Sequence, residues 1–464
     1  GDELKAVGEA HYRSKKDNRM WEWAESGARG NWGQFGQLVM GPMLVQNPAK
    51  EFVPVPLTTS FGEGLPISQY WAALHGARKG TLDRAAGTRD PGALTKELIN
   101  AVIAYSVTDK DCGTSKGTLM SVMAKDIEGR YLAREVPLKS GDKLTRGTLV
   151  SSALLTRIKN SGPQKILVRS PLHCQKAKGI CATCYGLNER GTLYKKGTNV
   201  GIIAGHALGE PVTQMQMRTF HTGGAGNDGL TDYFQQAKDL FKVPDKLRGA
   251  ATLAEVTGRV DKIETDALGG KKVTIGGKLH IVPHSTPLLP KIRVGVDVKK
   301  TDALSSGRKN PHDILRITNN IHAVRNHLTT ELDTLYVETT GNERRRNIET
   351  VIRAMTDVAQ VTESSEHENL LNGQMMSLSQ IEHRNRELKQ LGLPTIKHKP
   401  LLKPMDKVPL SGKEDWMARL NFQRLKDTLV EGGAQNWKSD INGHPIPGLA
   451  HGAAFGLQAP KVAP

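Results

Sequence analysis

Four cysteines constrain the fold of this 464-residue chain more than any other feature of its sequence. Cys181 and Cys184 form a CxxC pair, Cys174 lies just before them, and Cys112 is the only other cysteine. A structural zinc site needs four thiolate or imidazole ligands arranged as a tetrahedron. The spacing therefore predicts one Zn²⁺ held by all four thiolates, which would tie the segment around Cys112 to the later CxxC segment.

Two other interpretations of these cysteines stay open. His173, which precedes Cys174, could replace one thiolate, and a CxxC pair can also serve redox chemistry. A disulfide framework is excluded because four cysteines are too few for a chain of this length. In the zinc interpretation the ion fixes geometry and takes no part in a reaction.

The charge balance favours a polyanionic partner. Sixty-four Lys and Arg against 47 Asp and Glu give a formal charge of +17, and the basic residues are spread through folded segments rather than massed in a tail. This distribution favours the wall of a nucleic-acid channel, with a solvated basic surface or an adhesive protein of ribosomal type as the alternatives. No apolar run reaches the ~18 residues of a membrane span, so we expect a soluble, intracellular protein. The basic clusters are Arg78–Lys79, Lys176 to Lys178, Arg344 to Arg346 and Lys397 to Lys403.

Hydrophobic periodicity and turn residues predict a multi-domain α+β fold. The segment after residue 244 alternates in the manner of strands, and Asn310–Pro311 is a typical helix start. The expected regions are an N-terminal helix and loop region (1–65), a long helix (66–105), a zinc-binding region (106–199), a helical hairpin (200–243), a small β-barrel-like module (244–308), C-terminal helices (309–457) and a flexible tail (458–464).

The long helical segment contains several helix breakers. An interior Gly costs ~1 kcal/mol relative to Ala and an interior Pro ~3 kcal/mol, yet this segment holds Gly76, Gly80, Gly87 and Pro91. Two ordinary helices joined at Asp90–Pro91–Gly92 would explain them. The other explanation is one bendable helix of ~34 residues, ~51 Å long, whose backbone a ligand can approach closely.

The first helix of the hairpin carries a chemically mixed face. Gln214, Met217, Arg218 and His221 follow the spacing i, i+3, i+4, i+7, which places them on one side of a helix. A core stripe would be apolar, and a solvated stripe would not carry a well-placed Met. The pattern therefore indicates a binding face, although a helix-capping His221 before Gly223 is a simpler alternative for that residue.

Residues 200–224, VGIIAGHALGEPVTQMQMRTFHTGG, are similar to the trigger loop of the largest (β′) subunit of bacterial-type multi-subunit RNA polymerases. The run from Ser60 through His75-Gly76-Ala77-Arg78-Lys79-Gly80 to Thr95 resembles the bridge helix of that family, and Ser26 to Gly30 resembles the loop beneath it. The resemblance covers residues 20–455. It identifies the chain as similar to the C-terminal part of a DNA-directed RNA polymerase β′ subunit.

The resemblance assigns roles to residues of this chain. His221 and Arg218 are expected to be catalytic, with His221 acting either as a general acid toward pyrophosphate or as a positively charged positioner. Gln214, Met217 and Arg29 are expected to bind the nucleoside triphosphate, and the glycines from Gly223 to Gly229 to let the hairpin open and close. The expected nucleic-acid contacts are Arg78, Lys79, Thr88 and Arg89, and the expected zinc ligands are Cys112, Cys174, Cys181 and Cys184.

Magnesium-dependent nucleotidyl transfer needs clustered carboxylates, which the family carries in an Asn-Ala-Asp-Phe-Asp-Gly-Asp loop that this sequence lacks. The resemblance thus implies a subunit that is inactive alone, with the Mg²⁺ ligands on a partner chain. Implied partners are the N-terminal part of β′, β-like chains, DNA template, RNA and nucleoside triphosphates, and no membrane.

The compact sequence most resembles a split β′ of bacteriophage type. Such a chain would be cytoplasmic, in a bacterium or an infected host cell, or packaged in a virion. An NTPase is excluded because no Gly-x4-Gly-Lys-Ser/Thr loop occurs. The alternative function is a non-enzymatic, zinc-containing nucleic-acid-binding protein derived from the same fold.

Overall fold

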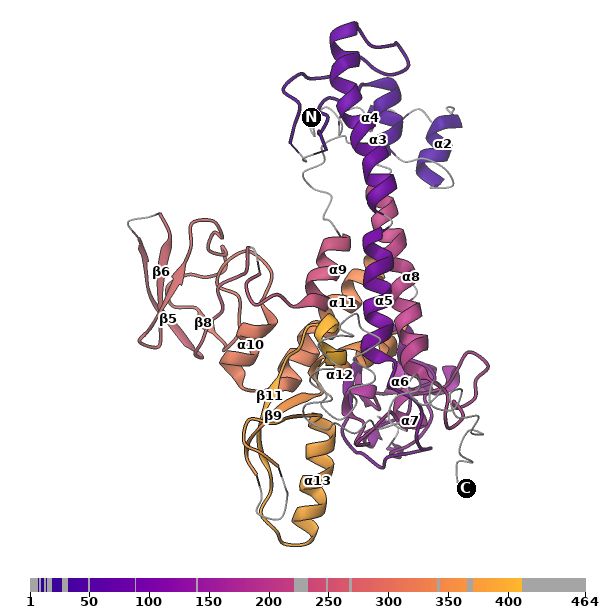
Figure 1. Ribbon diagram of the computed structural model, residues 1–464, viewed down its shortest axis with the longest axis vertical. Coiled ribbons are helices and arrows are strands. Elements are labelled where there is room, and N and C mark those ends of the chain that lie inside the picture. The colour runs from indigo at the N-terminus through magenta and orange to yellow at the C-terminus, as the bar shows by residue number, and fades with distance from the viewer. Residues whose placement is uncertain are drawn as a thin grey trace, which may run out of the picture. The chain divides into compact units, whose positions relative to one another are not determined.

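The structure is a computed structural model that describes residues 7, 10–11, 14, 19–26, 32–48, 51–87, 89–138, 141–220, 233–247, 249–266, 269–339, 343–364 and 370–410 (Figure 1). The chain forms two compact units, one of residues 1–94 and 209–236 and the other of residues 95–208 and 237–464. Among the described residues, no helix is both long enough and apolar enough to cross a bilayer. The mixture of helices and antiparallel sheets confirms the predicted α+β class.

The first unit is built around the helix α4 (Ile67–Gly87), with two short helices, α2 (Arg19–Ser26) and α3 (Trp32–Val39), before it. A loop between α3 and α4 forms a small core, in which Val45 and Leu57 pack with Ala72 of α4. This arrangement leaves Arg78 on α4 exposed to solvent.

Helix α5 (Arg89–Val102) follows α4, and Thr88 between them lies outside the described residues. Asp90, Pro91 and Gly92, considered above as a junction between two helices, lie within the first turn of α5. Proline is tolerated there because the first N–H groups of a helix have no intrahelical partner. Further along α5, Leu94, Leu98 and Val102 are buried at i, i+4 and i+8, so one face is committed to the core.

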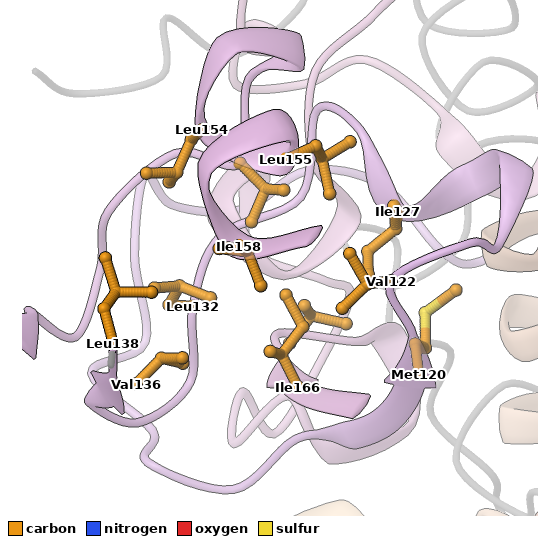
Figure 2. Close-up of a cluster of buried hydrophobic side chains, with 12 residues drawn as sticks. Met120, Val122, Ile127, Leu132, Val136, Leu138, Leu154, Leu155, Ile158 and Ile166 are labelled. Carbon is orange, nitrogen blue, oxygen red and sulfur yellow. The ribbon is translucent and has the colours of Figure 1, made fainter. Parts of the chain in front are cut away.

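The region that bears the cysteines has a core of its own. Ile158 of α6 (Ser152–Ser161) points into a cluster with Leu132 and Ile166, as Figure 2 shows. The strands β1 (Thr118–Ser121) and β4 (Lys165–Val168) pair antiparallel beside this core. The remaining elements are short: η1 (Lys125–Ile127), β2 (Val136–Pro137), β3 (Lys143–Leu144), η2 (Pro171–His173) and α7 (Ala182–Tyr185).

Two helices lie in the predicted hairpin. Helix α8 spans Val200–Phe220 and α9 spans Tyr233–Lys242, while residues 221–232 between them lie outside the described part of the chain. Asn199 begins α8, since its side chain accepts a hydrogen bond from the Ile202 N–H at 2.9 Å. The same side chain donates to the carbonyl oxygen of Ile103, just after α5, at 2.6 Å.

The strands predicted after residue 244 form one antiparallel sheet in the order β7-β6-β5-β8. A two-residue turn, Gly276–Gly277, joins β6 to β7, and both glycines have positive φ, as the tight hairpin turns require. The named strands leave β7 and β8 as the edges of an open sheet, so barrel-like closure stays a prediction. The strands are β5 (Gly258–Thr265), β6 (Lys271–Ile275), β7 (Lys278–Val282) and β8 (Asp297–Val298).

The C-terminal part begins with the predicted cap. Asn310 accepts the His312 N–H at 3.0 Å and Pro311 opens the helix. The region 309–457, expected to be helical, also contains strands, because one begins at Val358 and pairs with two later strands. The elements are α10 (Pro311–Thr318), α11 (Ile321–Thr339), α12 (Arg345–Thr356), β9 (Val358–Glu363), β10 (Met375–Met376), α13 (Leu378–Gln390), β11 (Lys397–Leu401) and η3 (Met405–Leu410).

Candidate functional site

The four cysteines meet in one cluster, as the sequence predicted. Cys112 comes from the loop after α5, Cys174 ends η2, and Cys181 and Cys184 lie at α7. All four Sγ atoms lie within 4.8 Å of one another, and those of Cys112 and Cys184 are 3.6 Å apart. His173 is not part of this group, because its ring stacks on His322 instead.

The cluster fits a tetrahedral zinc ion. Zn–S bonds of ~2.3 Å in a tetrahedron place neighbouring sulfurs ~3.8 Å apart, close to the observed 3.6 Å. Three of the cysteines are buried and Cys112 is half-buried, so the ligand set is closed to solvent on most sides. Four sulfur ligands leave no position for substrate, which is the arrangement of a structural site rather than a catalytic one.

The polar groups around the sulfurs suit thiolates. The buried guanidinium of Arg169 donates to the Sγ atoms of Cys112 and Cys184, at 3.3 Å in both cases, and also pairs with Asp111. Hydrogen bonds from Cys112 and the other two thiols hold the pKa of Cys174 well below its usual range, whereas hydrogen bonds with Cys112 and Cys174 raise the pKa of Cys181, and burial raises that of Cys184. Metals bind the thiolate form, so a bound cation would stabilise all four thiolates together.

Backbone contacts bring the distant Cys112 loop to the CxxC segment. The Ala182 and Thr183 N–H groups donate to the carbonyl oxygens of Asp109 and Lys110, at 2.8 and 2.9 Å. The Lys176 ammonium lies 2.8 Å from the Asp109 carboxylate, so part of the basic run from Lys176 to Lys178 serves an internal ion pair. The cluster therefore joins two chain segments through main chain as well as through sulfur.

A buried ion network links the cysteine region to α12. Arg130 lies 2.6 Å from Asp126 and 2.8 Å from Glu349, while Arg346 lies 2.8 Å from Asp126. Arg130, Arg346 and Glu349 are each at most 2% exposed. The prediction that Arg346 is one of the cations that face nucleic acid is therefore wrong, because its guanidinium is buried and pairs with Asp126. Ser170 completes the network by donating its hydroxyl to Glu349 at 2.8 Å.

Helices α5 and α8 pack backbone to backbone, side by side in Figure 1. A Cβ atom on Gly201 would lie 1.8 Å from the carbonyl oxygen of Val102, and one on Gly205 would lie 3.0 Å from the Ile99 Cα atom. Only glycine permits such an approach at the first of these positions. This contact was not expected from the sequence, although two glycines four residues apart on α8 are its signal.

The second helix of the same hairpin contacts α5 through an ion pair at the base of the hairpin. Lys242, the last residue of α9, lies 3.2 Å from the carboxylate of Glu97 on α5. The buried Tyr336 of α11 donates its hydroxyl to the carbonyl oxygen of Leu208 on α8 at 2.9 Å. Both ends of the hairpin that lie in the larger unit are thus anchored.

The predicted nucleotide and nucleic-acid residues are only partly described. Arg78 and Arg89 are exposed on α4 and α5, and Lys79 is half-buried on α4. Gln214, Met217 and Arg218 lie on α8, but their side chains fall outside what the structure describes. Arg29, Thr88 and His221 lie outside the described residues altogether. Their roles stay predictions.

The known proteins to which the chain is similar are RNA polymerase subunits. Residues 64–269 match the family described as RNA polymerase Rpb1, domain 5. The chain is 32% identical over 462 residues to the DNA-directed RNA polymerase subunit beta' of Acidothermus cellulolyticus, which covers 96% of this chain and 35% of the relative. The same subunit of Thermobifida fusca is 33% identical (96% and 35%), and that of Clostridium kluyveri 32% identical (96% and 38%).

The chain thus spans about a third of the length of these curated relatives while almost all of it takes part in the match. The matched segment 64–269 includes the cluster of four cysteines and the helices α5 and α8, which pack on each other at Gly201 and Gly205. Residues 64–269 therefore match the family described as RNA polymerase Rpb1, domain 5, and almost the whole chain is similar to a part of the β′ subunit of DNA-directed RNA polymerase.

Proposed function

We propose that this chain is the C-terminal catalytic-subunit part of a multi-subunit DNA-dependent RNA polymerase. In this proposal α4 and α5 form the bridge helix, and α8 and α9 form the two arms of the trigger loop. The observation that carries it is the anchoring of both arms on α5, through Gly201 and Gly205 on one side and Lys242 on the other. A hairpin fastened at its base can move at its tip while it stays registered against the bridge helix.

The sequence of α8 supplies a place for that motion. Pro211 lies inside the helix and cannot donate the N–H that would bond the carbonyl oxygen of residue 207. The two compact units divide between Leu208 and Gly209, next to this weak point. We infer that the arm bends there, so that residues up to 208 stay fixed while the segment with Gln214, Met217 and Arg218 moves.

In the proposed reaction, the 3′ oxygen of RNA forms a bond to the α-phosphorus of a nucleoside triphosphate, and the bond to pyrophosphate breaks. Met217 would pack on the incoming base, and Arg218 would neutralise charge on the triphosphate. His221 would either donate a proton to the leaving pyrophosphate or act as a fixed positive charge. Two Mg²⁺ ions, bound by carboxylates of another chain, would supply activation of the attacking oxygen and charge stabilisation.

The remaining parts would serve binding and geometry. The exposed Arg78 and Arg89, with Lys79, would contact template phosphates, which contributes affinity without sequence information. The zinc ion on Cys112, Cys174, Cys181 and Cys184 would hold the base of α8 near the end of α5. Its contribution is structural, since its four ligands are all protein sulfurs.

Purification of the chain from its native source, with mass spectrometry of the associated proteins, tests this proposal. We expect a stable complex with a chain that carries an Asn-Ala-Asp-Phe-Asp-Gly-Asp loop, and template-directed RNA synthesis by that complex. A chain that binds nucleic acid but purifies without such a partner would support the non-enzymatic alternative. Whether the partner comes from a virus would also test the split bacteriophage-type β′.

A further inference from the structure

A polar cavity of about 290 Å³ lies beside the cysteine cluster, in the larger compact unit. It is open to solvent and is lined by η2, by the first turns of α11 and by α13. Four cationic side chains line it, and Glu382 is the one carboxylate among its described lining residues. The cations are Lys116, Arg325, Arg386 and Lys389.

Arg325 is a buried cation with no carboxylate partner among the described residues. Its side chain is 5% exposed, and its guanidinium donates to three neutral acceptors, the hydroxyl and carbonyl oxygens of Thr356 and the carbonyl oxygen of Leu172. The buried Arg130 and Arg346, in contrast, both bond to Asp126. Burial lowers the pKa of Arg325 although the nearby charges of Asp357 and Glu382 oppose that shift. An additional anion would therefore stabilise its charged guanidinium.

Other polar groups lie around the cavity. The rings of His173 and His322 stack with centroids 5.4 Å apart, and the Nδ1 atom of each ring is buried and has no hydrogen-bond partner within the described structure. Ser379 accepts a hydrogen bond from Arg353 at 3.3 Å, which leaves its hydroxyl hydrogen able to donate. At the rim, neither the Lys116 nor the Lys389 ammonium forms an ion pair in the part of the chain described.

We propose that this cavity binds a phosphate group of a small molecule, which would compensate Arg325 and bridge the rim lysines Lys116 and Lys389. Phosphate suits the site because it carries more than one negative charge and accepts several charge-assisted hydrogen bonds. The volume is near the lower limit of small-molecule pockets, so it accommodates inorganic phosphate or a nucleoside monophosphate. This site is separate from the proposed nucleotide-addition residues and does not depend on their assignment.

Calorimetric titration of the zinc-loaded full chain with inorganic phosphate and with AMP tests the proposal. We expect one site per chain, and a loss of at least about tenfold in affinity when Lys116→Gln and Lys389→Gln are combined, since two charged contacts are removed. Lys143→Gln combined with Lys159→Gln removes two exposed lysines outside the cavity and should leave the affinity unchanged. Arg325→Gln should abolish binding if the variant folds. If it does not fold, the variant with Lys116→Gln and Lys389→Gln still tests the proposal.

The two probes distinguish the sources of the phosphate. Equal binding of both would indicate a free phosphate site, and tighter binding of AMP would indicate a phosphate ester. The proposal is overturned if neither phosphate nor AMP binds at a concentration of about 10 mM, ten times a millimolar dissociation constant. It is also overturned if the control substitutions weaken binding as much as the two cavity lysine substitutions do. It is also overturned if only single-stranded DNA binds in a manner that depends on Lys116 and Lys389, because the site would then belong to a nucleic-acid surface.

Discussion

Replacing Gly201 by alanine should break the contact between α8 and α5. The new Cβ atom would lie 1.8 Å from the Val102 carbonyl oxygen and 3.2 Å from the Tyr105 Cβ atom, so the two helices must separate by more than an ångström. Overpacking of this kind costs ~1–3 kcal/mol, and a clash with backbone lies at the upper end. The higher helix propensity of alanine relative to glycine offsets ~1 kcal/mol of this cost. The expected net destabilisation is therefore about 2 kcal/mol.

Gly92→Ala is the matched control. Gly92 lies on α5 with no heavy atom within 4 Å of its would-be Cβ position, so the same propensity gain comes without a clash. That variant should be unchanged or more stable by up to ~1 kcal/mol. Gly205→Ala, where the nearest atom would be 3.0 Å away, should fall between the two.

Hydrogen exchange measured by mass spectrometry on the zinc-loaded chain is the assay, because a chain with two compact units need not unfold in one step. Gly201→Ala should accelerate exchange in residues 95–105 and 200–208 by roughly thirtyfold, which corresponds to the ~2 kcal/mol above. Exchange in the β5–β7 sheet should not change. Wild-type exchange rates in the Gly201→Ala protein would refute the packing of α8 on α5.

Four further results are expected. Metal analysis should find one Zn²⁺ per chain, and Cys112→Ser should lose it and loosen residues 106–199, since structural zinc supplies folding free energy; full retention in that variant would contradict the four-thiolate site. Asp126→Asn should destabilise the fold by about 3–5 kcal/mol because it leaves Arg130 and Arg346 without this counter-charge; a change below ~1 kcal/mol in denaturant unfolding would argue against the network. Burial opposes ionisation of Asp126, but Arg130 and Arg346 outweigh it and lower the pKa of Asp126; its stabilisation should be present above pH ~4 and be lost as the pH falls further, a loss that Asp126→Asn should not show. Finally, the isolated chain should bind DNA weakly, with affinity falling as salt rises, and should make no RNA, because +17 supplies phosphate contacts without magnesium carboxylates; nucleotide addition by the pure chain would rule out the split-subunit proposal.

Local chemistry explains what the sequence predicted well. The cysteine cluster could be predicted because a CxxC pair with a nearby third cysteine leaves Cys112 as the one remaining cysteine for the fourth ligand. The helix start at Asn310 could be predicted because capping depends on three adjacent residues. The strands β5 and β6 could be predicted because apolar residues alternate within each of these short segments.

Contacts across long sequence separations were missed. Arg346 and its partner Asp126 are 220 residues apart, and an arginine in a basic run gives no sign that its guanidinium is buried. The strand Val358–Glu363 was not expected within the C-terminal helical region, because its partner strands are short and lie later in the chain. The Gly201 contact required knowledge of which helix passes α8, which periodicity alone does not provide.

The central claim is that the tip of the α8–α9 hairpin acts on the nucleotide. Single-nucleotide extension on a preformed nucleic-acid scaffold, at saturating nucleotide and with the assembled polymerase, measures that step apart from initiation. Arg218→Ala and His221→Ala should each slow addition by ~10²–10³-fold while assembly and DNA binding are retained. Arg134→Ala, at an exposed arginine of the cysteine region, should not slow it. For His221→Gln, a mild slowing would favour positioning and a full loss would favour acid catalysis. Wild-type extension by both alanine variants in a normally assembled complex would contradict the proposed role of the hairpin.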